Sequence, residues 1–234
     1  MKKKGSRLIH LLAVAGLLCA AVGTYFGLFV APPDRNQGET VRILYVHVPS
    51  AWIMMVCFTL AFGFAIWSLW SGDRRADGLM VGSVEVGTIL TGLVLIQGML
   101  WARPTWGVWW TWDVRLTFTL ILFLLFAGIL ALRAVVDDRG RRATWSAVAT
   151  IIAYADVPLV YYCVRWWRSL HQMQSSPETV DPMMLIPLRL NAFAVLFLSL
   201  WMIALRARLE TARVAREEVD LPERIPLEGS VEHA

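Results

Sequence analysis

The chain has 234 residues, of which 57% are hydrophobic and 17% charged, with a formal net charge of +4. This composition is too apolar for a soluble domain of that length, and the modest positive charge does not indicate nucleic-acid binding. The three cysteines lie inside apolar runs without CxxC or CxxCH spacing, which argues against disulfides, thiol redox chemistry or a covalently attached cofactor. The sequence contains no P-loop, GxSxG or Rossmann glycine pattern, which excludes ATPases and hydrolases of those kinds.

Six apolar runs are long enough to cross a bilayer, which takes about 20 residues for a helix. The expected spans are 8–30, 51–71, 78–101, 116–135, 144–164 and 186–206. The first run follows Met-Lys-Lys-Lys, as in a cleaved signal peptide, but it is long for one and is interpreted as a retained span. The sequence therefore predicts an all-α membrane domain of six transmembrane helices over 1–206, followed by a polar tail, 207–234.

The basic residues predict the orientation of these helices. Fifteen of the 22 lysines and arginines lie before the first span, after the last one, or in the loops that follow spans two and four. Positive charge is retained on the cytoplasmic side, so both termini are expected to be cytoplasmic. The three other segments, 31–50, 102–115 and 165–185, are then expected to face outward.

The outward segment around residues 101–117 is rich in tryptophan, with five of the twelve in the chain. If the stretch is helical, Trp106, Trp109, Trp110 and Asp113 share one face. Such an aromatic surface, flanked by arginines, suits a large planar ligand with negative charge. The alternative is an interfacial belt, since Trp is enriched where the membrane meets water.

Two of the four histidines, His47 and His171, also lie in outward segments. Imidazole is a ligand for iron, and haem iron has two axial positions that two imidazoles could occupy. The alternative for either residue is a solvent-exposed or hydrogen-bonded side chain. The arginines of these segments could pair with haem propionates or extend to lipid headgroups. These arginines are Arg42, Arg103, Arg115, Arg165 and Arg168.

Two acidic residues, Glu85 and Asp156, lie within the predicted spans. Acids inside a membrane are costly and indicate a function or a partner. We interpret both as packing or partner contacts rather than as catalytic groups. Asp113 is expected to hold Arg115 or to cap the fourth helix rather than to bind iron.

The segment Trp106-Gly-Val-Trp-Trp-Thr-Trp-Asp113 resembles the tryptophan-rich WWD signature of haem-handling membrane proteins. Together with His47-Val-Pro-Ser-Ala-Trp52 and Trp166-Trp167-Arg-Ser-Leu-His171-Gln172, it is similar to the cytochrome c maturation protein C family, also called haem exporter protein C. The resemblance covers about residues 40–206. The WWD signature alone also occurs in the larger cytochrome c synthetase subunits.

The resemblance implies a protein of the bacterial inner membrane, in contact with lipid, that binds haem b at its outer face without enzymatic turnover. It also implies presentation of that haem to the periplasmic chaperone maturation protein E, within an ABC-type complex of maturation proteins A, B and D. The implied platform residues are Trp106, Trp109, Trp110, Trp112 and Asp113. The implied axial ligands are His47 and His171, and the leading propionate partners are Arg42, Arg103 and Arg115.

Two other functions remain as alternatives. A permease for haem or another small molecule would use the acids in the spans to line a pathway, and its site would be reachable from both sides. A cytochrome c synthetase would need outer loops large enough to dock an apocytochrome, and the predicted loops are short for that task.

Overall fold

The computed structural model describes residues 2–171 and 180–219, and within them it is helical apart from short connections. The helices are α1 (Lys2–Tyr25), α2 (Leu44–Ser71), α3 (Arg74–Trp106), α4 (Val114–Val135), α5 (Arg139–Ala153), α6 (Asp156–Trp166) and α7 (Pro182–Val219). A π-helical turn, Phe26–Val30, continues α1, and a 3-10 turn, Glu39–Ile43, leads into α2.

Six helical segments of the described chain are long and apolar enough to cross a membrane, which confirms the predicted all-α architecture. They are Ile9–Val30, Glu39–Ser71, Arg74–Trp106, Val114–Val135, Arg139–Trp166 and Pro182–Arg216. The fifth consists of α5 and α6 together, and the last is most of α7.

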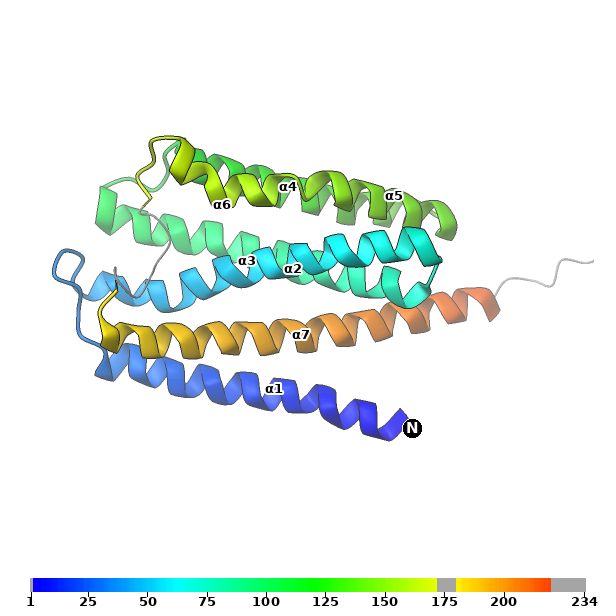
Figure 1. The fold of residues 1–234 in the computed structure, drawn as a ribbon, viewed down its shortest axis with the longest axis horizontal. Coiled ribbons are helices and arrows are strands. Elements are labelled where there is room, and N and C mark those ends of the chain that lie inside the picture. Colours follow the sequence, from blue (N-terminus) through cyan, green and yellow to red (C-terminus); the bar gives the residue numbers. More distant parts are fainter. Residues whose placement is uncertain (1, 172–179, 220–234) are drawn as a thin grey trace, which may run out of the picture.

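The helices form three layers (Figure 1): α4, α5 and α6 lie on one side, α2 and α3 in the middle, and α7 and α1 on the other side. The hairpin of α2 and α3 packs against both outer layers. The centre of the core includes Phe58 of α2 stacked on Phe126 of α4 at 3.8 Å between ring centroids, with both side chains fully buried.

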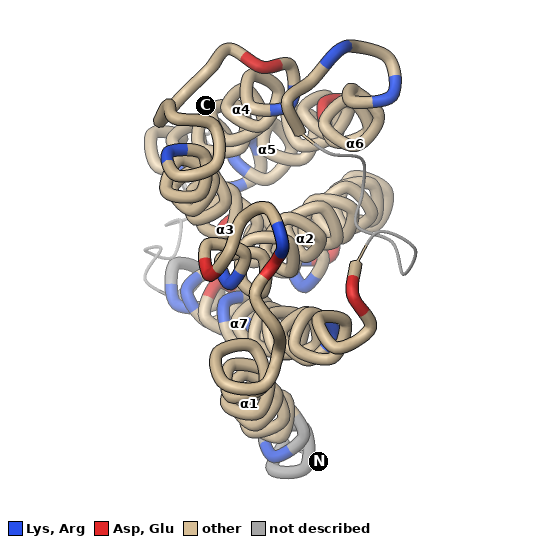
Figure 2. Tube along the Cα trace, turned by 90° about the vertical axis from the view of Figure 1, so that its left-hand side faces the viewer, with Lys and Arg blue, Asp and Glu red and all other residues tan. Residues whose placement is uncertain are grey.

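The described residues of the three segments predicted to face outward gather at one end of the bundle, which Figure 2 views directly. The start of α1 and the described end of α7 lie at the opposite end. There, Arg133 of α4 donates hydrogen bonds to Asp77 of α3 at 2.8 Å and to Glu210 of α7 at 3.1 Å. Arg206 likewise bonds Glu85 at 2.6 Å. Glu85 is therefore paired, as a buried or membrane-embedded charge must be to be tolerated.

Two helices differ most from their predicted bounds. Helix α2 begins at Leu44 rather than at 51, so His47 lies in its first turn and not in a loop as predicted. Pro49 lies inside the helix, in its second turn, where it has no N–H to donate to the carbonyl four residues earlier. The last helix extends beyond 206 to Val219, and the rest of the predicted tail lies outside the described residues.

The fifth span is broken between Ala153 and Asp156. Pro158 has no N–H to donate to the carbonyl of Tyr154, which instead accepts from Val157 at 3.0 Å. After the break, α6 packs against α4, whereas α5 packs against both α2 and α4. Asp156 is buried at the break, and its Oδ2 has no hydrogen-bond partner among the residues that the structure describes.

Candidate functional site

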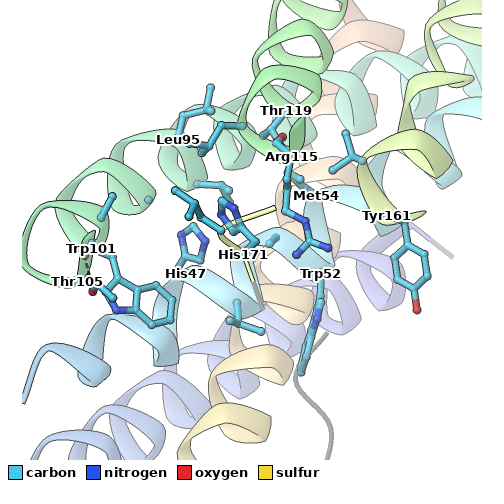
Figure 3. Close-up of a pocket in the computed structure, with 18 of the residues that line it drawn as sticks. His47, Trp52, Met54, Leu95, Trp101, Thr105, Arg115, Thr119, Tyr161 and His171 are labelled. Carbon is cyan, nitrogen blue, oxygen red and sulfur yellow. Dashed lines mark hydrogen bonds between the residues drawn. The ribbon is translucent and has the colours of Figure 1, made fainter. Parts of the chain in front are cut away.

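A cavity of about 200 Å³ lies near the loop end of the bundle, between α2, α3, α4, α6 and the segment after α6 (Figure 3). Its lining combines apolar side chains with aromatic and polar ones. The aromatic and polar residues are Gln37, His47, Trp52, Trp101, Thr105, Trp106, Arg115, Thr119, Tyr161 and His171. The fold thus brings the two predicted histidines, which are distant in sequence, to one cavity with a predicted arginine.

His47 is held from the α3 side of the cavity. Its ring packs edge-on against Trp101, at 5.6 Å between centroids, and the Trp101 indole donates to the Gln37 side chain at 2.7 Å. Gly98 lies against the same ring, since a Cβ at this position would be 3.4 Å from His47 Cε1, an ordinary van der Waals distance. The Nδ1 atom of His47 is buried without a hydrogen-bond partner among the described residues. A buried, unpartnered nitrogen is costly unless something absent from the chain itself binds it.

His171 follows α6 and is held by two contacts. Its ring lies edge-on to Trp106 at 5.1 Å, and its Nδ1 lies 3.3 Å from Asp113 Oδ1. An Nδ1–H that faces this carboxylate leaves Nε2 as the nitrogen with a free lone pair. Burial and the nearby Arg115 guanidinium lower the pKa of His171 from 6.5, although Asp113 acts in the opposite direction. The imidazole is therefore neutral at neutral pH, which is the form that binds metals.

Asp113 connects three elements of the site. Its side chain accepts from the Arg115 amide at 2.9 Å, which caps α4 as expected. It also accepts from the Leu170 amide at 2.8 Å and from the Ser169 hydroxyl at 3.0 Å. Burial alone would raise the pKa of Asp113, but these hydrogen bonds outweigh it and hold the pKa below its usual value. A charged Asp113 therefore fixes the segment that carries His171 to the start of α4.

Of the three arginines named as propionate partners, Arg115 alone lines the cavity. Arg42 instead bonds the side chain of Glu39 and the backbone carbonyl of Gly27. Arg103 donates to the Gly107 carbonyl at 2.8 Å. In this conformation, Arg42 and Arg103 stabilise the backbone at the loop end rather than reaching the two histidines.

The tryptophan-rich stretch is not a continuous helix, so the prediction that four of its residues share one helical face is wrong. Helix α3 ends at Trp106, and Gly107 caps it with a φ of 78°, a conformation that favours glycine. Trp106 lines the cavity, whereas Trp109 and Trp112 are 56% and 75% exposed. Trp110 lies edge-on to Trp112, at 5.6 Å between ring centroids.

Three aromatic residues of the cavity were not among the predicted site residues: Trp52, Trp101 and Tyr161. Trp52 belongs to the segment that begins with His47, and Trp101 opens the tryptophan-rich stretch. Both could have been found by extending those motifs. Tyr161 carries no signal in the sequence, because its place depends on how α6 is turned by the break before it.

The six spans define a multi-pass membrane protein, and the cavity at one end, lined by two histidines and several aromatic side chains, is its candidate ligand site. A family model described as heme exporter protein C (CcmC) matches residues 2–221. The heme exporter protein C of Bradyrhizobium diazoefficiens is 37% identical over 219 residues, which cover 89% of this chain and 81% of the relative. The chain belongs to the heme exporter protein C family and is a multi-pass protein of the bacterial inner membrane.

Similarity of the same kind extends to other relatives. The heme exporter protein C of Escherichia coli is 35% identical over 199 residues, which cover 84% of this chain and 81% of the relative. A putative cytochrome c biosynthesis ccmC-like mitochondrial protein of Arabidopsis thaliana is 31% identical over 223 residues, covering 92% and 84% respectively.

Proposed function

We propose that this chain binds haem b through His47 and His171 at the outer face of the membrane and hands it on for cytochrome c biogenesis. The observation that carries the proposal is that two histidines from distant segments line one cavity. The names of the relatives, heme exporter protein C, support haem as the cargo. The chain acts as a haem-handling component rather than an enzyme.

The chemistry of the cavity fits haem. The iron offers two axial positions, while His47 has an unpartnered buried nitrogen and His171 has Nε2 free of the Asp113 contact. Trp106 and Trp101 contribute aromatic walls, and Arg115 supplies a cation for a propionate. His47 and His171 would hold the iron, and the apolar lining of the cavity would contact the macrocycle.

The size of the cavity favours a haem that is only partly enclosed. Its volume of about 200 Å³ lies below the range of about 300–1,000 Å³ that encloses drug-sized ligands. Part of a bound haem would then remain accessible from outside the cavity, at the end of the bundle that also carries the exposed Trp109 and Trp112. A haem exposed in this way can be passed directly to a second protein.

We assign that second protein as the periplasmic chaperone maturation protein E, with the chain forming part of an ABC-type complex with maturation proteins A, B and D. The exposed tryptophans at the loop end suit a transient contact, since aromatic residues are enriched in interfaces. In this arrangement both termini are cytoplasmic and the cavity opens toward the periplasm.

The direct test is the absorption spectrum of the protein purified from membranes of cells that make haem. We expect co-purified haem with the spectrum of a low-spin, bis-histidine iron. Protein that carries no haem even when its chaperone is co-expressed would contradict the proposal and favour the permease alternative.

Cysteine labelling tests the orientation and separates this function from that of a permease. In a Cys19→Ala background, Leu170→Cys lies at the cavity and Asp137→Cys lies in the exposed loop at the other end. We expect an impermeant maleimide to label Leu170→Cys in intact spheroplasts, and Asp137→Cys only after permeabilisation. Labelling of Leu170→Cys from the cytoplasmic side of inverted vesicles would support a permease.

Arg115 can be tested against Arg103, which differs in that it does not line the cavity. We expect Arg115→Gln to weaken haem affinity by about ten-fold or more, because a charge-assisted hydrogen bond to a carboxylate contributes about 1.5–3 kcal/mol. Arg103→Gln should change the affinity little. The measurement is a titration of the apo-proteins with haem in detergent, and equal losses in the two variants would contradict the assignment.

A further inference from the structure

A second cavity, of about 450 Å³, lies on the outside of the bundle beside the first one. We call it the lateral groove. It is lined by Val56, Thr59 and Leu60 of α2, by Tyr154 of the break, and by Val157, Pro158 and Tyr162 of α6. Three further lining residues, Trp52, Met55 and Tyr161, also line the histidine cavity. The groove and the cavity are therefore adjacent and separated by side chains rather than by backbone.

The groove exists because the fifth span is broken. Helix α5 packs against α2, but beyond the break α6 packs mainly against α4. Beside the break itself, α2 is still in contact with the fifth span. The Thr59 hydroxyl lies 3.2 Å from the Tyr154 hydroxyl, and Phe62 stacks on Tyr154. From these contacts toward the loop end of the bundle, α2 and α6 are separated by the groove, and only side chains lie between them. Val56 and Tyr162 are each 39% exposed there, within helical segments that are long and apolar enough to cross a membrane.

We infer that haem reaches the histidine cavity sideways from the lipid through the lateral groove, with Trp52, Met55 and Tyr161 as the barrier that it displaces. The inference rests on the proposed function, since it takes haem as the ligand of the histidine cavity. Figure 3 shows Trp52 and Tyr161 on the side of the cavity away from Trp101, where they come from α2 and α6. Methionine and aromatic side chains are suited to this role, because Met is flexible and aromatic rings stack on a planar ligand.

The charges near the groove match the way haem lies in a bilayer. A planar amphiphile places its two carboxylates among the headgroups and its ring among the acyl chains. Arg165, in the last turn of α6, lies with its guanidinium carbon 5.6 Å from the centre of the Tyr162 ring, and Tyr162 stacks on Trp166. Arg115 lies at the inner side of the same path. The ring can thus move from Tyr162 to the histidines while its carboxylates stay at the outer face and exchange Arg165 for Arg115.

The test fills the groove without touching the histidine cavity. Val56→Trp and Thr59→Leu both add volume to the groove and change no residue that lines the histidine cavity. Ile66→Trp is the matched control, because Ile66 lies on the same helix, is 42% exposed, and lines neither cavity. Each apo-protein is reconstituted in phosphatidylcholine vesicles that already contain haem b, and the growth of the ligated-haem absorption band is followed with time.

We expect Val56→Trp and Thr59→Leu to bind haem about ten-fold more slowly than wild type, because the added side-chain atoms occupy the groove and must be displaced before haem can pass. Their final spectra should equal that of wild type, which also shows that they are folded. Ile66→Trp should bind at the wild-type rate. Wild-type rates in both groove variants would overturn the lateral route. A wild-type protein that never develops the spectrum would instead overturn the proposed function.

Discussion

Purified His171→Ala is expected to lose its haem, or to keep it with a five-coordinate, high-spin spectrum, and added imidazole is expected to restore the wild-type spectrum. The affinity should fall by more than about 100-fold, because even changes to groups that orient a metal ligand cost about 10–100-fold. The imidazole of His171 is wedged between Trp106 and Asp113, so its removal leaves a space of the shape that free imidazole can fill.

The same result is expected for His47→Ala, whose imidazole packs on Trp101 on the other side of the cavity. His10→Ala is the matched control, since His10 is exposed on α1 near the opposite end of the bundle. Unchanged spectra in both cavity variants would show that other groups ligate the iron. Loss of haem without recovery by imidazole would indicate a structural role for the histidines instead.

Asp113→Asn is expected to weaken haem binding about 10–100-fold while leaving the fold of the protein intact. Asn remains a good helix cap, so α4 still begins at its usual residue. The neutral amide accepts more weakly than the carboxylate from Ser169 and Leu170, and its NH2 group can point toward His171 Nδ1. The imidazole then loses the partner that keeps Nε2 available for the iron.

The control for this variant is Asp138→Asn, because Asp138 caps α5 in the same way, at the opposite end of the bundle. Both variants should unfold within a few degrees of wild type in a thermal scan, whereas only Asp113→Asn should lose haem affinity and shift the haem spectrum. Equal effects of the two substitutions would mean that Asp113 acts only as a cap. Asp113→Glu, which retains the charge, should recover part of the affinity.

The spans could be read from the sequence because crossing a bilayer demands length and apolarity, which are local properties of a segment. The roles of single residues near span ends were harder to predict. His47 was placed in a loop, yet it lies in the first turn of α2, since the apolar residues Leu44, Tyr45 and Val46 before it are already helical. Gly107 carried the signal that the tryptophan stretch is not one helix, but the spacing of Trp106, Trp109 and Trp110 favoured the opposite interpretation.

The sequence alone was enough to indicate the class of protein, the family, and the two histidines as candidate ligands. Hydropathy, motifs and residue types are properties of short segments, so they can be recognised without knowing how the segments pack. The tertiary structure alone placed Arg115 and not Arg103 beside these histidines, joined Asp113 to His171, and added Tyr161 to the cavity. These are contacts between segments far apart in sequence, and they depend on how α3, α4 and α6 pack. The break before Pro158 decides the last of them, because it turns α6 away from α2 and opens the lateral groove.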